Sequence, residues 1–311
     1  MCELSLKDFS SALCTELEKL FDGCKVSITE TLKVNDVKKT AVILQKDGVN
    51  LGMTLYTDEI YVHYKNGESI EEIAVRLHRN YASYIAERSV DTNLFHDFKA
   101  IKDNIYCRLL NKQLSNELLE TLPYRDFLDL ALVYYLEVEL PELQTGTVLI
   151  NNSMIKGWSD VSEKTLYNIA ISNLSKKTYI VEDMFELVKS LGYLDSAVTD
   201  DLELDIAEMQ NNCNMHILRY TDISFGSSVL LSKECLEECA KIYGGDFFIL
   251  PSSVFELIAI PMIAQDTDWQ ENLQGLRDMV SSVNNTQVKD TEILSYNIYK
   301  YCTASKSLVV L

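Results

Sequence analysis

Apolar side chains near the start of the chain recur at the spacing of an amphipathic helix. In residues 4–21 they fall on one face: Leu6, Phe9, Leu13, Leu17 and Leu20. Ser69 and Glu72 have the spacing of a capping box, in which each side chain bonds the other residue's backbone, and they predict a helix that runs to about residue 87. Between these helices, residues 40–46 and 49–56 flank Lys46-Asp47-Gly48, a sequence typical of a hairpin turn. The first third therefore predicts a small helix-plus-hairpin lobe.

Nearly continuous apolar runs dominate the rest of the chain. Such runs are typical of strands that are covered on both faces. They occur at residues 126–138, 147–151, 215–220, 246–251 and 254–260. Helical patterns separate them at residues 94–102, 113–122, 162–174, 181–191, 232–243 and 269–283, and a terminal hairpin is predicted at 297–301 and 308–311. We expect a mixed α/β (α+β) fold with one central mixed sheet and helices packed on it.

The charge is distributed unevenly along the 311 residues. The formal net charge is -19, of which -2 falls on residues 1–112 and -17 on residues 113–311. This change predicts an N-terminal α+β lobe over 1–112 and an acidic C-terminal α/β lobe over 113–311. With only 4 Pro and 11 Gly, the sequence favours lobes joined directly rather than by a flexible linker.

Charge and composition also exclude several classes of function. An acidic surface repels a phosphate backbone, so direct nucleic-acid binding is not expected. No apolar run reaches the length of a membrane span, and the N-terminus has no basic and apolar signal region, so we expect a cytoplasmic protein without a membrane partner. In the cytoplasm the eight cysteines are expected to be reduced and mostly buried.

One set of residues has the composition of a zinc site. Cys213 and His216 lie three apart, and Cys235 and Cys239 lie four apart on a predicted helix. Sulfur and nitrogen ligands suit tetrahedral zinc, but this spacing matches no common zinc module. We therefore interpret the cysteines of this set as buried, reduced thiols and predict no metal, no disulfide and no cofactor.

Three carboxylates are the weak catalytic candidates. Asp126 and Asp129 flank the start of the longest apolar run, and Glu256 stands alone among apolar neighbours. Two or more of them converging in a deep pocket would favour a hydrolase-type enzyme. Phosphate-binding glycine motifs and a G-x-S-x-G nucleophile motif are absent from the sequence. A structural role at the strand end is the favoured interpretation for Asp126 and Asp129, and an outward-facing position on a strand is favoured for Glu256.

An acidic segment at residues 195–208 is the candidate binding surface. It has no Lys or Arg, and its acidic residues are Asp195, Asp200, Asp201, Glu203, Asp205 and Glu208. Such a field attracts basic proteins and weakens with salt. A purely solubilising role for the segment is equally compatible with its composition.

Several segments resemble a bacterial family. They include Phe127-Leu128-Asp129-Leu130-Ala131, Met215-His216-Ile217-Leu218 and Met279-Val280-x-x-Val283-Asn284-x-Thr286, and Phe248-Ile249-Leu250-Pro251-Ser252-Ser253 is the most specific. These segments are similar to a family catalogued only as a domain of unknown function, number 5688, found mainly in Gram-positive gut bacteria. The chain departs from its pattern at residues 174–177 and at Ser295-Tyr296, where Ser-Asp is commoner.

The resemblance implies a compact bacterial protein, often encoded near mobile elements, and no reaction. We therefore expect a non-catalytic protein-binding or regulatory protein with a basic protein partner. One alternative is an inhibitor of a nucleic-acid-processing defence enzyme that acts through the acidic surface. A hydrolase-type enzyme built on Asp126, Asp129 or Glu256 is the other.

Overall fold

The computed structural model describes residues 3–85, 89, 92–140, 143–190, 214–262 and 269–311. The chain divides into two compact units, Met1–Phe95 and His96–Leu311. The charge distribution places the boundary after residue 112, whereas this division falls between Phe95 and His96. Strand β4 (Ile105–Asn111) therefore belongs to the second unit.

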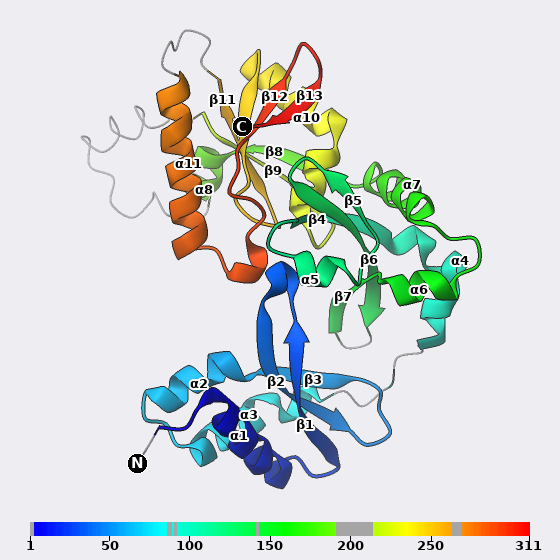
Figure 1. Ribbon diagram of the computed structural model, residues 1–311, viewed down its shortest axis with the longest axis vertical. Helices are drawn as coiled ribbons and strands as arrows, with labels where there is room; N and C mark the ends of the chain where they lie inside the picture. The colour runs from blue at the N-terminus through cyan, green and yellow to red at the C-terminus, as the bar shows by residue number, and fades with distance from the viewer. Residues whose placement is uncertain (1–2, 86–88, 90–91, 141–142, 191–213, 263–268) are drawn as a thin grey trace. The chain divides into compact units, whose positions relative to one another are not determined.

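The first unit is a three-stranded antiparallel sheet packed against helices (Figure 1). Its strands lie in chain order, and the hairpin predicted after residue 46 joins the second strand to the third. The elements are α1 (Leu6–Leu20), β1 (Cys24–Leu32), β2 (Lys38–Lys46), β3 (Gly52–Tyr56), α2 (Thr57–Lys65) and α3 (Ile70–Tyr81), with 3₁₀ turns η1 (Val34–Asp36), η2 (Ala82–Tyr84) and η3 (Thr92–His96).

The predicted apolar face of α1 forms the core of this unit. Phe9, Leu13 and Leu17 are fully buried and pack with Leu44 of β2 and Leu77 of α3. The capping box at the start of α3 is confirmed, because the side chains of Ser69 and Glu72 each bond the other residue's backbone. The apolar face of α1 therefore accounts for the core of this unit, and the capping box accounts for the start of α3.

The second unit contains two further antiparallel sheets. In the four-stranded sheet, β6 lies in the centre, β4 pairs along one side of it, and β5 and β7 pair along the other. The six-stranded sheet has the order β13-β12-β10-β11-β9-β8. Their bounds are β5 (Tyr124–Phe127), β6 (Leu130–Leu140), β7 (Leu143–Leu149), β8 (Tyr179–Asp183), β9 (His216–Tyr220), β10 (Phe247–Leu250), β11 (Leu257–Pro261), β12 (Tyr299–Cys302) and β13 (Ser307–Val310).

Helices cover both faces of the six-stranded sheet (Figure 1). Because side chains alternate along a strand, Phe247 and Phe248 of β10 face opposite sides. Phe247 packs beside Tyr243 of α10, and Phe248 packs in one cluster with Leu273 of α11. The helices of this unit are α4 (Phe98–Ile101), α5 (Asn116–Leu119), α6 (Asn152–Gly157), α7 (Glu163–Leu174), α8 (Met184–Ser190), α10 (Lys233–Tyr243) and α11 (Trp269–Thr286), with 3₁₀ turns η4 (Lys102–Asn104), η5 (Gly226–Leu231) and η6 (Asp290–Glu292).

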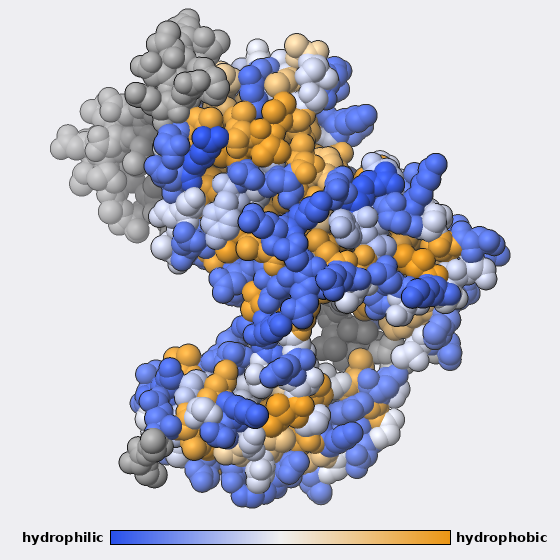
Figure 2. Space-filling model, viewed as in Figure 1, coloured by the Kyte–Doolittle hydropathy of each residue, from blue (hydrophilic) through white to orange (hydrophobic). Residues whose placement is uncertain are grey.

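Apolar surface gathers beside α11, over β12, β13 and the C-terminus (Figure 2). In this region Leu311 and Ile260 are only partly buried against the α11 cluster. Within the described residues, none of the helices is both long enough and apolar enough to cross a membrane.

The α+β class is confirmed, but the expectation of one central sheet is wrong. The run 126–138 is not a single strand, because the chain reverses at Leu128, whose φ is 57°, and joins β5 to β6. The remaining predicted strands belong to both sheets of the unit, and their pairings are antiparallel. The turn is made by Leu128 and Asp129 and contains no Gly or Pro, so the sequence pattern does not indicate a turn there.

The helix predicted over residues 181–191 is also partly wrong. Residues 179–183 form the edge strand β8, and the helix α8 begins only at Met184. Asp183 ends the strand and accepts hydrogen bonds from the backbone N–H groups of Phe185 and Glu186, at 2.9 and 3.0 Å. The predicted buried strand over 246–251 is confirmed by β10, which lies inside the sheet and is buried along its length.

Candidate functional site

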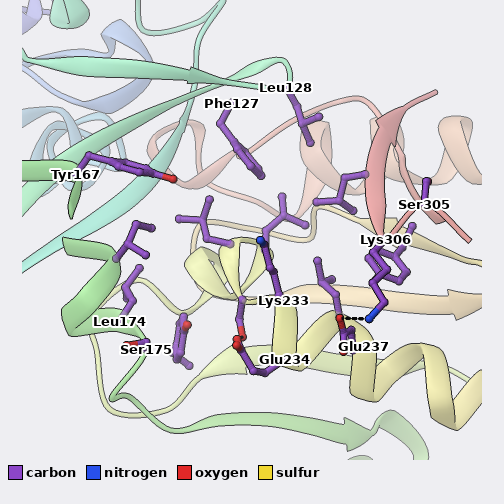
Figure 3. Close-up of a pocket in the computed structure, with 18 residues that line it drawn as sticks. Phe127, Leu128, Tyr167, Leu174, Ser175, Lys233, Glu234, Glu237, Ser305 and Lys306 are labelled. Carbon is purple, nitrogen blue, oxygen red and sulfur yellow. Dashed lines mark hydrogen bonds and ion pairs between the residues drawn. The ribbon is translucent and has the colours of Figure 1, made fainter. Parts of the chain in front are cut away.

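A cavity of about 870 Å³ lies in the second unit (Figure 3). The tip of the β5–β6 hairpin, α7, the β12–β13 turn, η5 and the first turns of α10 surround it. Its lining includes these apolar and aromatic residues: Phe127, Leu128, Tyr167, Ile171, Leu174, Tyr220, Leu230, Leu231, Leu236, Tyr301 and Leu308. Its charged and hydroxyl-bearing residues are Ser175, Ser232, Lys233, Glu234, Glu237, Ser305 and Lys306.

The N-terminus of α10 supplies the charged side of the pocket. Ser232 caps the helix, because its hydroxyl accepts a hydrogen bond from the backbone N–H of Cys235 at 3.2 Å. Lys233 follows and extends toward Phe127 and Leu128 (Figure 3). In the part of the chain that the structure describes, its ammonium makes no hydrogen bond or close ion pair and acts on Glu237 at longer range. The next residue, Glu234, accepts a hydrogen bond from Ser232 at 3.3 Å.

An ion pair ties the β12–β13 turn to α10. Lys306 donates to Glu237 at 2.8 Å, and this hydrogen bond lowers the pKa of Glu237 and raises that of Lys306. Tyr301 lies beside the pair, and burial followed by the negative charge of Glu237 raises the pKa of its phenol. Because Lys306 neutralises Glu237, Lys233 is the pocket cation that remains without a close acidic partner among the described residues.

A four-residue cluster holds the α7 wall. Arg125 of β5 donates two hydrogen bonds to Glu163 at 3.1 and 3.0 Å, and Tyr134 of β6 donates a third. Burial acts to raise the pKa of Glu163, but the bonds from Arg125 and Tyr134 outweigh it and lower that pKa. The guanidinium of Arg125 also lies 3.9 Å from the ring centre of Tyr167, whose side chain points into the pocket (Figure 3).

The hairpin tip is fixed by a polar cluster behind it. Asp129 Oδ2 accepts hydrogen bonds from the Ser295 hydroxyl at 2.7 Å and from the Asn297 amide at 2.9 Å. Tyr299 lies beside the same carboxylate, and burial followed by the negative charge of Asp129 raises the pKa of its phenol. These bonds position Leu128 at the pocket wall.

Comparison with known proteins identifies the family but no activity. Residues 6–303 match the Family of unknown function (DUF5688). The chain belongs to this family. The resemblance found in the sequence segments is thereby confirmed, and the match also spans the N-terminal unit. No curated protein and no solved structure matches the chain.

In this DUF5688 chain the lining of the pocket includes none of the three candidate carboxylates. Asp126 forms an exposed ion pair with Lys112 at 2.6 Å. Asp129 is engaged by Ser295 and Asn297. Glu256 is half-buried and accepts through its carbonyl from the Ser253 backbone N–H at 3.2 Å. The pocket carboxylates are instead Glu234 and Glu237.

The structure describes Cys235, Cys239 and His216 of the zinc-like set, but none of the candidate binding residues of the acidic segment. Cys235 and Cys239 are fully buried on α10, and burial raises the pKa of both thiols, that of Cys239 to about 12. His216 Nδ1 lies 2.9 Å from the Tyr243 hydroxyl, and burial lowers the pKa of the imidazole. Cys213 lies outside the described residues, as do Asp195, Asp200, Asp201, Glu203 and Asp205. Within the described part, no group of three His, Cys, Asp or Glu residues could hold a metal ion.

Sequence reasoning missed the residues that line the pocket. Lys233, Tyr167 and Lys306 come from three separate elements and share no local motif. One sequence signal pointed to the site: a helix predicted to begin at Ser232 places Lys233 and Glu234 in its first turn.

Proposed function

We propose that this protein is a non-catalytic binding protein whose second unit holds an amphipathic ligand in the pocket. The ligand has an apolar, ring-sized body and a single anionic group. The pocket lined by aromatic and aliphatic side chains, with Lys233 extending into it, is the observation that carries this proposal.

The size and lining of the pocket support such a ligand. A cavity of about 870 Å³ has the volume of a drug-sized binding site, and such sites combine apolar walls with a few placed polar groups. Lys233 lies at the N-terminus of α10, where the helix dipole also favours negative charge. Glu237 is already paired with Lys306. The positive charge of Lys233 is therefore available to attract the anionic group of a ligand.

The positions of the candidate carboxylates favour a binding protein over a hydrolase. Acid–base catalysis needs groups that converge on one reacting centre. Asp126 and Asp129 are held by different partners, and neither of them, nor Glu256, lines the pocket. The pocket glutamates are engaged as well, Glu237 by Lys306 and Glu234 by Ser232.

Fluorescence titration with anilinonaphthalene sulfonate tests the proposal, because this probe has an aromatic body and one anionic group. We expect saturable binding to the folded wild type. Ser175→Trp, which places an indole at the pocket wall, should reduce the affinity at least 10-fold. Lys233→Gln should reduce it about 3- to 10-fold, which corresponds to the loss of one partly exposed charge interaction.

Two matched variants serve as controls. Ser172→Trp adds the same indole to an exposed position of α7 outside the pocket, and Lys241→Gln removes a lysine from the last turn of α10. Both should bind the probe like the wild type. Equal affinity for Ser175→Trp and the wild type would rule out this pocket as the binding site.

A basic protein partner is the second candidate, favoured by the net charge of -17 on residues 113–311. Acidic fields of this kind accelerate encounter with basic proteins. The proposal places the protein in the cytoplasm, where its buried thiols stay reduced. Converting Asp200, Asp201, Glu203 and Asp205 to their amides should weaken capture of a basic partner at low salt. Unchanged capture would remove this candidate.

A further inference from the structure

Two charged residues of the pocket, Lys233 and Glu234, have no close partner of opposite charge. They follow each other at the start of α10, and both line the cavity of about 870 Å³. Among the described residues, no carboxylate lies within ion-pair distance of the Lys233 ammonium, and no Lys or Arg lies within that distance of the Glu234 carboxylate. The pocket therefore offers a ligand one positive and one negative charge.

The other two charges of the pocket neutralise each other. Lys306 donates to Glu237 at 2.8 Å, so this ion pair presents no net charge to a ligand. Glu234, in contrast, accepts a hydrogen bond from the Ser232 hydroxyl at 3.3 Å, and a hydroxyl brings no positive charge. The pocket is lined by two cationic and two anionic side chains, and its complement is a ligand with both signs of charge.

The two available charges lie on different sides of the pocket. In Figure 3 the Lys233 side chain extends toward Phe127 and Leu128 at the tip of the β5–β6 hairpin, whereas Glu234 lies nearer to Ser175 at the end of α7. Adjacent residues of a helix do not face each other, so the two side chains diverge from the first turn of α10. A ligand that meets both charges therefore spans the pocket.

The charge of Glu234 acts inside the pocket, as its effect on Tyr220 shows. Tyr220 lines the pocket and is only 5% exposed. Burial raises the pKa of its phenol to about 12, and the negative charge of Glu234 adds to that rise. The phenol is therefore neutral near pH ~7 and adds no second negative charge beside Glu234.

A ligand without net charge also suits the electrostatics of the second unit. Residues 113–311 carry a formal net charge of -17. A protein field of one sign repels ligands of the same sign, so a simple anion is repelled as it approaches Lys233. A ligand that also carries an ammonium group is attracted to this field at one end.

We infer that the ligand of this pocket is an aromatic zwitterion, with its anionic group beside Lys233 and an ammonium group beside Glu234. This inference rests on the proposed function, because it concerns the same pocket and adds a second charged group to the same ligand. An ammonium forms a charge-assisted hydrogen bond with a carboxylate, which is stronger than the bond that Glu234 accepts from Ser232. The aromatic and aliphatic residues of the lining contact the ring between the two charges.

A matched pair of ligands tests the inference. The zwitterion para-(aminomethyl)benzoate and the anion para-ethylbenzoate share the ring and the carboxylate, and they differ in the ammonium. Both should displace anilinonaphthalene sulfonate from the wild type. Glu234→Gln should weaken binding of the zwitterion about 3- to 10-fold and leave binding of the ethyl compound unchanged. Lys233→Gln should weaken both by the same factor, because both carry the carboxylate.

The controls separate this inference from the proposed function. Glu238→Gln removes an exposed carboxylate of α10 outside the pocket lining and should bind both ligands like the wild type. Unchanged affinity for the ethyl compound shows that the pocket of Glu234→Gln is intact.

Three results would overturn the inference and leave the proposed function standing: neither ligand displaces the bound probe, Glu234→Gln weakens both ligands equally, or it does not weaken the zwitterion. Failure of the wild type to bind the probe would remove the proposed function, and the inference with it.

Discussion

Asp129 at the tip of the β5–β6 hairpin accepts a hydrogen bond from the Ser295 hydroxyl at 2.7 Å. Ser295 is buried and precedes β12, so this bond joins the four-stranded sheet to the six-stranded sheet. Leu128, beside Asp129, lines the pocket. The pocket wall therefore depends on a contact between residues from distant parts of the chain.

Replacing Asp129 should show that its carboxylate stabilises the fold. Asp129→Ala removes the acceptor of two hydrogen bonds and should destabilise the protein by about 2–3 kcal/mol. Asp126→Ala, three residues earlier, breaks only an exposed ion pair with Lys112 and should cost less than about 1 kcal/mol. Urea unfolding of both variants checks this, and equal stability losses would contradict the assignment.

Arg125→Lys should show that the α7 wall needs a planar, two-donor cation. Lysine cannot make both bonds to Glu163 while stacking on Tyr167, so we expect a loss of about 1 kcal/mol and weaker probe binding. Arg76→Lys makes the same change in the first unit, where Arg76 bonds Glu68 twice, and should leave probe binding unchanged. Titration of Arg125→Lys and Arg76→Lys with the probe shows whether Arg125 positions the α7 wall or only adds stability. Equal probe affinity of the two variants would contradict the positioning role.

Asp246 should make stability depend on pH in the acid range. The backbone N–H and hydroxyl of Thr303, followed by Lys300, hold the pKa of its carboxyl at about 2. Since this is below the ordinary value of about 3.9, the ionised group stabilises the fold above pH ~4, and that contribution is lost as the pH falls toward ~2.

Wild type should therefore exceed Asp246→Asn by about 2 kcal/mol at neutral pH, and the difference should shrink between pH ~4 and ~2. Chemical unfolding over that pH range measures it. A difference that stays constant down to pH ~2 would show that the carboxyl does not have the lowered pKa.

Gly226→Ala should disrupt the second unit. The added Cβ would lie 2.3 Å from the Phe255 carbonyl oxygen and 2.9 Å from that of Tyr220, and both are backbone atoms. We expect a loss of about 3 kcal/mol or more. Gly157→Ala at the end of α6 meets no atom within 4 Å and should be neutral or slightly stabilising. Comparable Tm values for the two variants would contradict this reasoning.

The parts of the fold that local signals encode could be predicted from the sequence. The capping box at Ser69, the helix that begins after Ser232 and the buried strand at Phe247 each rest on a short, self-contained pattern. The reversal at Leu128 could not be predicted this way, because tertiary bonds to Asp129 stabilise a turn that has no Gly or Pro. The long apolar run therefore looked like one strand.

Most residues of the candidate site could not be predicted from the sequence, for a related reason. Tyr167, Lys233 and Lys306 converge only after α7, α10 and the β12–β13 turn have packed together, so no spacing along the chain links them. Arg108 is a charged residue inside the mostly apolar strand Ile105–Asn111. Within the described residues it has no carboxylate partner like those of Arg76 and Arg125, and only the structure shows this.

The most direct test of ligand binding in the pocket is methyl NMR of the full chain during titration with anilinonaphthalene sulfonate. We expect saturable shifts of the methyl groups of Leu128, Leu174, Leu231 and Leu308, which line the pocket. Leu273 of α11 and Leu13 in the first unit should not shift. Shifts confined to Leu273 and its neighbours, or no saturable shift of the pocket methyl groups, would contradict the proposal that this pocket binds an amphipathic anion.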